Sequence, residues 1–205
     1  MILKGLVVGM LGTNCYIIGC EATGIGAVVD PGAESERVLE ELEKLNLNCQ
    51  YIILTHGHMD HIGEVGEVRA ATGAQVLIHA ADADRLVNPG RFSTLPVGES
   101  KPGGADRILQ HGDEINVGTI KIKVIHTPGH TPGGICLNLG DNLITGDTLF
   151  AESIGRTDLS GGSYTDLISS IKERLLIFPD ETVVYPGHGP SSTIGTERRF
   201  NPFLQ

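Results

Sequence analysis

The stretch Thr55-His56-Gly57-His58-Met59-Asp60-His61 places four side chains that can bind a metal ion within six residues. It directly follows the apolar run 51–54, whose length and β-branched residues predict a strand. Imidazole and carboxylate groups are ligands that zinc and other transition metals accept. A loop of solvated histidines that bind nothing would not need four possible ligands within six residues. We therefore interpret the stretch as part of a metal site.

Three more candidate ligands follow apolar runs in the same way. His130 lies just after the run 120–125, Asp147 follows 142–145, and His188 follows 182–185. Open α/β sheets place their ligands at the carboxyl ends of strands. Glycines stand beside these residues and allow the backbone to bend there. We therefore expect seven ligand-type side chains to converge at one edge of the sheet system.

The number of candidate ligands indicates the kind of centre. Five histidines and two aspartates exceed what one tetrahedral zinc needs, and a structural zinc site closes with four ligands. Two adjacent metals suit the set better, and a carboxylate such as Asp147 can bridge them. Two ions about 3.5–4 Å apart can hold a bridging hydroxide that attacks a carbonyl. The pattern thus favours a hydrolase over a non-catalytic zinc-binding module.

Short apolar runs alternate with helical patterns and predict an α/β or α+β fold. The predicted strands contain residues 6–8, 16–18, 27–29, 51–54, 76–78, 120–125, 143–144 and 182–185. Amphipathic or capped segments predict helices over 34–45, 63–71 and 166–176, the last one capped by Ser163. The segment 88–104 is rich in Pro and Gly and predicts a surface loop, with a domain linker as the alternative.

Length and charge exclude several classes of protein. A chain of 205 residues favours one domain and can bury about 70 % of its surface on folding. The net charge of −10 argues against non-specific nucleic-acid binding. The four cysteines form no CxxC pair, which indicates free, buried thiols in a reducing compartment. No segment has the roughly 20 apolar residues of a membrane span. We expect a cytoplasmic protein with no nucleic-acid or membrane partner.

Together, the His-x-His-x-Asp-His motif, the isolated His130, the Gly146-Asp147 pair and the Gly187-His188-Gly189 turn resemble the metallo-β-lactamase superfamily over residues 14–203. The loop 155–158 and the C-terminal segment 193–203 are similar to those of glyoxalase II-like single-domain hydrolases. The resemblance implies an α+β fold, a four-layer αβ/βα sandwich with two mixed β-sheets flanked by helices. It also implies that residues 1–205 form one catalytic domain without a C-terminal helical substrate-binding domain.

The resemblance implies a role for each site residue. The first metal would be held by His56, His58, His130 and Asp147, and the second by Asp60, His61, Asp147 and His188. Asp60 and Asp147 would be the catalytic carboxylates. Two Zn²⁺ ions are expected, although Fe or Mn suits the same donors.

Arg156 is the one basic residue in the matched loop that could meet a carboxylate of the substrate thiol. An ion pair with Asp158 is the alternative role for its side chain. The tyrosine that glyoxalase II enzymes have after the last metal histidine is absent, because Gly189-Pro190-Ser191 follows His188. The sequence therefore leaves the identity of the thiol open.

The expected activity is hydrolysis of a small anionic thioester, S-lactoylglutathione or a related acyl-thiol. The alternative is a persulfide dioxygenase with a single non-haem iron on His56, His130 and Asp147. A lactonase is a less favoured interpretation, and a β-lactamase or nuclease is less favoured still.

His79, His111 and His126 are expected to be structural or to orient a ligand. The sequence does not predict the oligomeric state.

Overall fold

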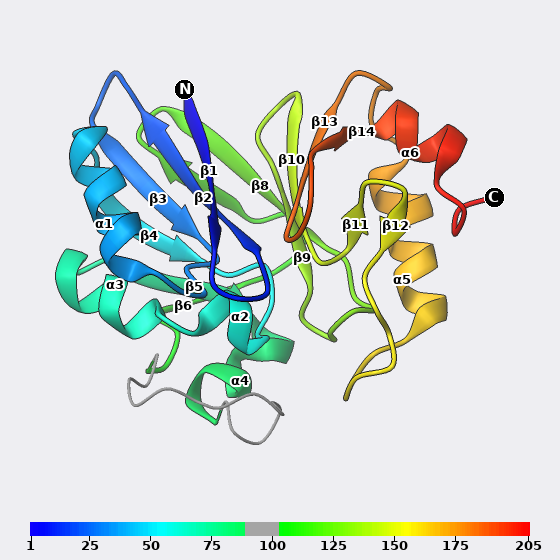
Figure 1. Ribbon diagram of the computed structural model, residues 1–205, viewed down its shortest axis with the longest axis horizontal. Coiled ribbons are helices and arrows are strands. Elements are labelled where there is room, and N and C mark those ends of the chain that lie inside the picture. The colour runs from blue at the N-terminus through cyan, green and yellow to red at the C-terminus, as the bar shows by residue number, and fades with distance from the viewer. Residues whose placement is uncertain (89–102) are drawn as a thin grey trace.

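The computed structural model describes residues 1–88 and 103–205, so most of the predicted loop 88–104 lies outside the described residues. Two six-stranded sheets face each other and helices cover their outer faces. In Figure 1, α1 and α3 lie on the left and α5 and α6 on the right, with the sheets between them.

The first sheet has the strands in chain order. They are β1 (Ile2–Val8), β2 (Thr13–Cys20), β3 (Ile25–Val29), β4 (Asn48–Ile53), β5 (Gln75–His79) and β6 (Arg107–Leu109). The first three strands pair antiparallel, whereas β3 to β6 pair parallel. The parallel pairs need crossover connections, which contain α1 (Ser35–Lys44), the single turn α2 (Met59–Ile62), α3 (Val65–Thr72), the 3₁₀ turn η1 (Ala80–Asp82) and α4 (Ala83–Val87).

The second sheet has the order β14-β13-β10-β9-β8-β7. Its strands are β7 (Glu114–Val117), β8 (Ile120–His126), β9 (Ile135–Asn138), β10 (Asn142–Gly146), β13 (Val183–Pro186) and β14 (Ser192–Thr193). Only β10 and β13 pair parallel, and the connection between them contains the small hairpin of β11 (Leu149–Phe150) and β12 (Ser153–Ile154). The same connection contains α5 (Tyr164–Ser170), which continues into the π-helical turn η3 (Ile171–Leu175); α6 (Ile194–Phe200) follows β14.

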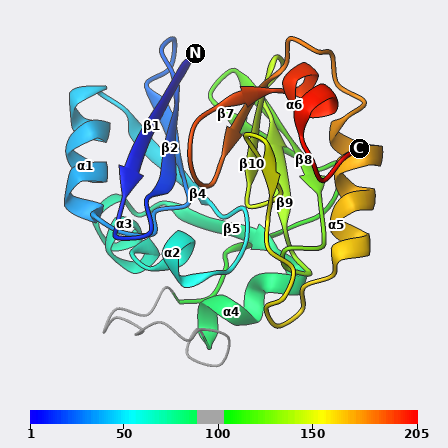
Figure 2. The same cartoon turned by 45° about the vertical axis from the view of Figure 1, so that its right-hand side comes forward.

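Three apolar clusters hold four layers together. Ile18 and Ile53 of the first sheet pack with Val124 and Ile144 of the second, and this cluster fills the space between the sheets. A second cluster lies between the first sheet and α1 and α3, and a third between the second sheet and α5 and η3. The rotated view in Figure 2 shows α1 on one outer face and α5 on the other. The αβ/βα sandwich with two mixed sheets is thus confirmed.

Each of the eight predicted strands is present, and most extend by one to five residues beyond the apolar run. The predicted helix 34–45 is α1, 63–71 corresponds to α3, and 166–176 corresponds to α5 with η3. Ser163 caps α5 as expected, since its Oγ accepts a hydrogen bond from the backbone N–H of Asp166. The four cysteines are free and buried. None of the helices within residues 1–88 and 103–205 has the length and apolarity that a membrane span requires.

Candidate metal centre

The ends of four strands bring the seven predicted ligands together. The motif 55–61 follows β4, while His130, Asp147 and His188 follow β8, β10 and β13 of the opposite sheet. His58 Nδ1 lies 2.9 Å from His130 Nε2, and His61 Nε2 lies 3.3 Å from His188 Nε2. The expected placement at carboxyl strand ends therefore occurs, with both sheets contributing.

Three groups of possible ligands occur among the described residues, and two of them consist only of predicted ligands, whereas the third adds Asp30 to His56 and His61. His56, His58 and His130 offer nitrogen atoms that all lie within 4.8 Å of one another, and Asp60, His61 and His188 form a second such group. Asp147 lies between the groups. Its Oδ2 is 3.5 Å from His130 Nε2, and its Oδ1 is 3.3 Å from His61 Nε2. One carboxylate thus reaches both groups, as a bridging ligand must.

Two buried atoms at the centre fit a bound cation. His56 Nε2 and Asp147 Oδ1 have no hydrogen-bond partner among the described residues. Buried polar atoms without a partner are costly, and a bound cation would satisfy both. The residues therefore fit metal binding, and the two donor groups suggest a binuclear centre. The assignment of each ligand to one metal stays a prediction.

Burial sets the charge of the first group. It lowers the pKa of His56 well below its ordinary value and that of His58 to about 3. It also lowers the pKa of His130. These imidazoles are therefore neutral near pH 7, which is the form that binds a metal.

The second group carries the carboxylates. Burial opposes ionisation of Asp60, but the neighbouring His188 and His61 together outweigh it and lower the Asp60 pKa. Burial opposes ionisation of Asp147 too, and the nearby His61, His130 and His188 together outweigh it and lower the Asp147 pKa. In turn, burial disfavours a charged His61, but Asp147 and Asp30 together raise its pKa. Both carboxylates stay ionised and attract positive charge to this part of the centre.

Asp30 is a functional residue that the sequence analysis missed. It is buried at the end of β3, and its Oδ1 accepts a hydrogen bond from the Thr55 backbone N–H at 2.7 Å. Its Oδ2 accepts from Thr55 Oγ1 at 2.6 Å and lies 2.9 Å from His61 Nδ1. Asp30 therefore orients His61 and anchors the start of the histidine motif. Asp30 directly follows the predicted strand 27–29. The expectation that ligands lie just after strands, which identified the other candidates, could therefore have identified it too.

Backbone carbonyls orient two more histidines. His130 Nδ1 donates to the carbonyl of Arg156 at 2.7 Å, and His188 Nδ1 donates to the carbonyl of Leu11 at 3.1 Å. A ring that donates from Nδ1 presents an unprotonated Nε2 to the centre. The 155–158 loop and the β1–β2 turn thus take part in the site through their backbone.

The side chain of Arg156 is about 61 % exposed and pairs with Asp158. Two hydrogen bonds join them, Nε to Oδ1 at 2.8 Å and Nη2 to Oδ2 at 2.7 Å. The ion pair that the sequence offered as an alternative therefore forms. A role for Arg156 in substrate binding stays a prediction.

The three remaining histidines lie outside the two donor groups. The ring of His79, at the end of β5, stacks on that of His126, at the end of β8, with centroids 3.9 Å apart. His126 Nε2 donates to the carbonyl of Pro132 in the His130 loop, and its backbone N–H donates to His111 Nδ1. These contacts join the two sheets and support the loop of one predicted ligand.

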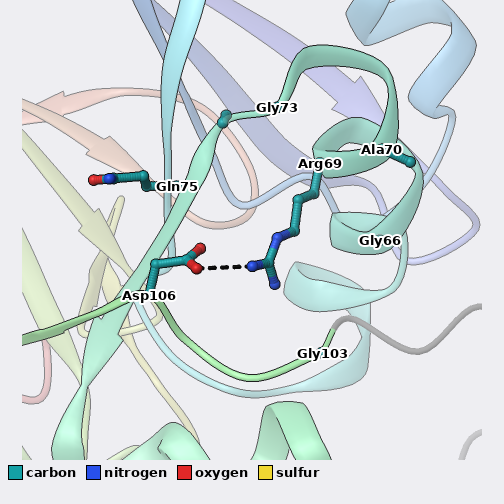
Figure 3. Close-up of a pocket in the computed structure, with 8 residues that line it drawn as sticks. Gly66, Arg69, Ala70, Gly73, Gln75, Gly103 and Asp106 are labelled. Carbon is teal, nitrogen blue, oxygen red and sulfur yellow. Dashed lines mark hydrogen bonds and ion pairs between the residues drawn. The ribbon is translucent and has the colours of Figure 1, made fainter.

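Of two hollows on the protein, one reaches a predicted metal ligand and the other does not. A groove of about 360 Å³ reaches Asp60 and is lined by Val8, Met10, Leu11 and Met59. Another hollow, about 440 Å³, lies beside α3 and β5 (Figure 3). There Arg69 already pairs with Asp106 at 2.7 Å. The first hollow is the one that a substrate of the metal centre can use.

Comparison with known proteins places these features in a family. The sequence profile described as Metallo-beta-lactamase superfamily matches residues 8–188. The chain is 36 % identical to hydroxyacylglutathione hydrolase GloC of Haemophilus influenzae, with 93 % of this chain and 92 % of that protein covered.

Solved structures are similar over nearly the whole chain. The crystal structure of the BLEG-1 B3 metallo-beta-lactamase has a TM-score of 0.91 and 36 % identity, and both chains are covered fully. ETHE1 from Myxococcus xanthus has a TM-score of 0.84 and 34 % identity over 98 % of this chain and 84 % of that one. TTHA1623 in a di-iron-bound form has a TM-score of 0.84 and 35 % identity, over 98 % of this chain and 100 % of that one.

Proposed function

Because this chain belongs to the metallo-beta-lactamase superfamily, as the sequence resemblance indicated, we propose that it is a binuclear metal-dependent hydrolase of thioesters. One observation carries the binuclear part of the proposal. Asp147 lies within 3.6 Å of histidines from both donor groups. All seven predicted ligands can therefore bind the metals of one binuclear centre. The likeness to GloC, whose name is hydroxyacylglutathione hydrolase, supports the thioester part.

We assign the first metal to His56, His58, His130 and Asp147, and the second to Asp60, His61, Asp147 and His188. When bound, two such ions polarise a carbonyl group and lower the pKa of bound water to about 7. We propose Zn²⁺, while the di-iron form of TTHA1623 makes iron the rival.

The chain's own residues then position the reactants. Asp60 Oδ2 accepts a hydrogen bond from Thr13 Oγ1 at 3.2 Å and lies 3.2 Å from His188 Nε2. The hydroxyl of Thr13 keeps the ionised carboxylate in place at the end of the apolar groove. The side chains of Met10 and Leu11 give that groove an apolar wall that an acyl or thiol chain can contact. Arg156, released from Asp158, would meet a carboxylate of the substrate.

The remaining features of the substrate and its setting are also proposals. We propose a small anionic thioester, no nucleic-acid or membrane partner, a single catalytic domain over residues 1–205, and a cytoplasmic location. Four free and buried cysteines and a net charge of −10 support these features.

The second candidate is a persulfide dioxygenase with one iron on His56, His130 and Asp147. The di-iron-bound form of TTHA1623 supports iron at such a centre, which this activity needs. A mononuclear site, however, would give no role to the assembled group of Asp60, His61 and His188. We therefore rank the hydrolase first.

Metal analysis combined with substrate assays tests the ranking. We expect two metal ions per chain and turnover of S-lactoylglutathione or of another member of a thioester panel. Asp147→Ala should lose both the second ion and the activity. Oxygen uptake with glutathione persulfide and one iron per chain would establish the dioxygenase instead. A β-lactam in the same panel tests the activity named for BLEG-1, and a fully loaded enzyme inert on every thioester would overturn the proposal.

A further inference from the structure

Asp82 is a fully buried carboxylate that joins two loops of the centre. Its Oδ2 accepts a hydrogen bond from the backbone N–H of Gly57 at 2.9 Å, and its Oδ1 accepts one from Gly133, also at 2.9 Å. Gly57 lies between the predicted ligands His56 and His58, and Gly133 lies three residues after His130. One side chain from η1 thus holds histidine loops that belong to opposite sheets.

The packing around Asp82 is tight enough to fix this arrangement. A Cβ atom added at Gly133 would lie 2.7 Å from Cβ and Cγ of Asp82. At Gly57 it would lie 2.5 Å from Cδ of Arg85, one helical turn further along the same segment. Both loop backbones therefore rest directly on residues 82–85, and neither can carry a side chain at the point of contact.

Arg85 extends the contact to a third loop. Its Nε lies 3.5 Å from Asp82 Oδ1, and its Nη2 donates to the carbonyl of Ser160 at 2.8 Å. Ser160 belongs to the same loop as Arg156, whose carbonyl accepts the hydrogen bond from His130. The segment 82–85 thereby contacts three loops near His58 and His130, those of Gly57, Gly133 and Ser160.

We propose that Asp82 is a positioning residue that sets the spacing of His58 and His130 and so determines the affinity of the first metal site. The inference rests on the metal binding in the proposed function, and not on the thioester chemistry. The second site has separate supports, since Asp30 holds His61 and the Leu11 carbonyl holds His188. Loss of Asp82 should therefore affect one site and spare the other.

The carboxylate is chemically specific for this task. Both of its oxygens accept hydrogen bonds, one from each loop. Asparagine has the same shape but only one acceptor oxygen, so its amide group would face one of the two backbone N–H groups. Two donors that face each other in a buried place push one loop away. Asp82→Asn is thus a small change that breaks one of the two contacts.

The test compares metal affinities of Asp82→Asn with those of Glu197→Gln. Glu197 is the matched control because it is also fully buried and accepts hydrogen bonds from the Glu152 backbone and from Asn201, both at 2.8 Å. Competition with a chromophoric chelator measures the two Zn²⁺ affinities of each protein. We expect Asp82→Asn to bind one ion about 10–100-fold more weakly and the other normally. Glu197→Gln should lower thermal stability and leave both affinities unchanged.

Each outcome has a distinct meaning. A wild-type protein that binds no metal overturns both the proposed function and this inference. Two normal ions in Asp82→Asn, or an equal loss at both sites, overturn the inference alone. If Asp82→Asn does not fold, hydrogen exchange in the wild-type apoprotein tests whether Asp82 holds the two loops. The Gly57 and Gly133 amides should then exchange at least tenfold more slowly than that of Gly140 in an open turn, and equal rates would overturn the inference.

Discussion

His61 donates its Nδ1 proton to Oδ2 of Asp30 across 2.9 Å, and the opposite ring nitrogen faces the carboxylates of Asp60 and Asp147. This bond decides which nitrogen of His61 is free for a metal. Asp30 has a positive φ of 54°, a conformation that asparagine also adopts readily. The side chain can therefore be changed at this position with little strain in the backbone.

Asp30→Asn should weaken the second metal site. An amide nitrogen in place of Oδ2 would make His61 accept at Nδ1 and move its proton to Nε2, where a metal would bind. We expect about 10–100-fold lower affinity for one of the two ions. Chelator competition measures this loss, and Asp82→Asn, which is expected to affect the other ion, is the comparison. Two ions bound with wild-type affinity would contradict the role given to Asp30.

Gly187→Ala should displace the bridging carboxylate. A Cβ atom there would lie 2.1 Å from Oδ1 of Asp147 and 2.9 Å from Cε1 of His61. Because Asp147 has to move, we expect more than tenfold lower activity and loss of one ion. Gly104→Ala is the control, since a Cβ atom at Gly104 meets no atom of residues 1–88 and 103–205 within 4 Å. Equal activity of the two variants would show that Asp147 does not need its present position.

The sequence predicted the ligands better than their supports. The ligands form a dense local motif and recur after strands, so neighbouring residues reveal them. Asp30 follows a strand in the same way and could have been found. Asp82 could not, because its role depends on contacts with Gly57 and Gly133, which are 25 and 51 residues away. Nothing in the sequence around Asp82 indicates those partners.

The secondary structure shows the same division between local and distant causes. The apolar runs 16–18, 51–54 and 120–125, which lie in β2, β4 and β8, were recognisable by themselves. The strand β6 has only three residues and exists because it pairs with β5 at the sheet edge. The helix α6 has few apolar residues and begins at a Thr193 cap, whose hydroxyl accepts from the Thr196 N–H. Such elements depend on the tertiary structure or on a cap more than on periodicity.

Met10→Asp should weaken substrate binding without affecting the metals. Met10 is fully exposed at the turn between β1 and β2 and lines the groove that reaches Asp60. Loss of its apolar contact with a substrate chain should cost about 1 kcal/mol, or about a fivefold rise in KM. We expect unchanged kcat, metal content and Tm. The same variant should have no effect on a thioester whose chains are too short to reach Met10, and a fall in kcat with both substrates would contradict this assignment.

His79→Phe should reduce the loss of stability in acid. Burial lowers the pKa of His79 in the folded protein, and the neighbouring His126 lowers it further, against the opposing effect of Asp82. As the pH falls below about 6.5, the unfolded chain therefore takes up a proton that the folded protein does not, and the free energy of unfolding decreases. Phenylalanine keeps a flat ring against His126 but cannot titrate. Urea unfolding of Zn²⁺-saturated protein measures the free energy of unfolding at pH 7.5 and at pH 5.5. This free energy should decrease less between the two pH values for the variant than for wild type, and equal decreases would contradict this account.

Arg156 and Asp158 offer a test of whether the substrate is anionic. The hydrogen bonds from Arg156 lower the Asp158 pKa to about 2, so this carboxylate is ionised at any working pH and competes with a substrate carboxylate. Asp158→Asn should therefore lower KM for an anionic thioester, and Arg156→Gln should raise it. Exposed ion pairs contribute about 0.2–1 kcal/mol, which limits either change to about fivefold.

A neutral thioester with the same acyl group is the control for both variants. Its KM should stay constant, because neither side chain has a charge to meet on it. The backbone carbonyl of Arg156 accepts the hydrogen bond from His130 Nδ1, so a disturbed loop would act through the metal centre instead. In that case kcat would fall for both substrates and one ion would bind more weakly. Opposite shifts in KM that are confined to the anionic substrate would show that the charges of this pair act on the substrate, and they would support the guanidinium as the group that binds the thiol's carboxylate.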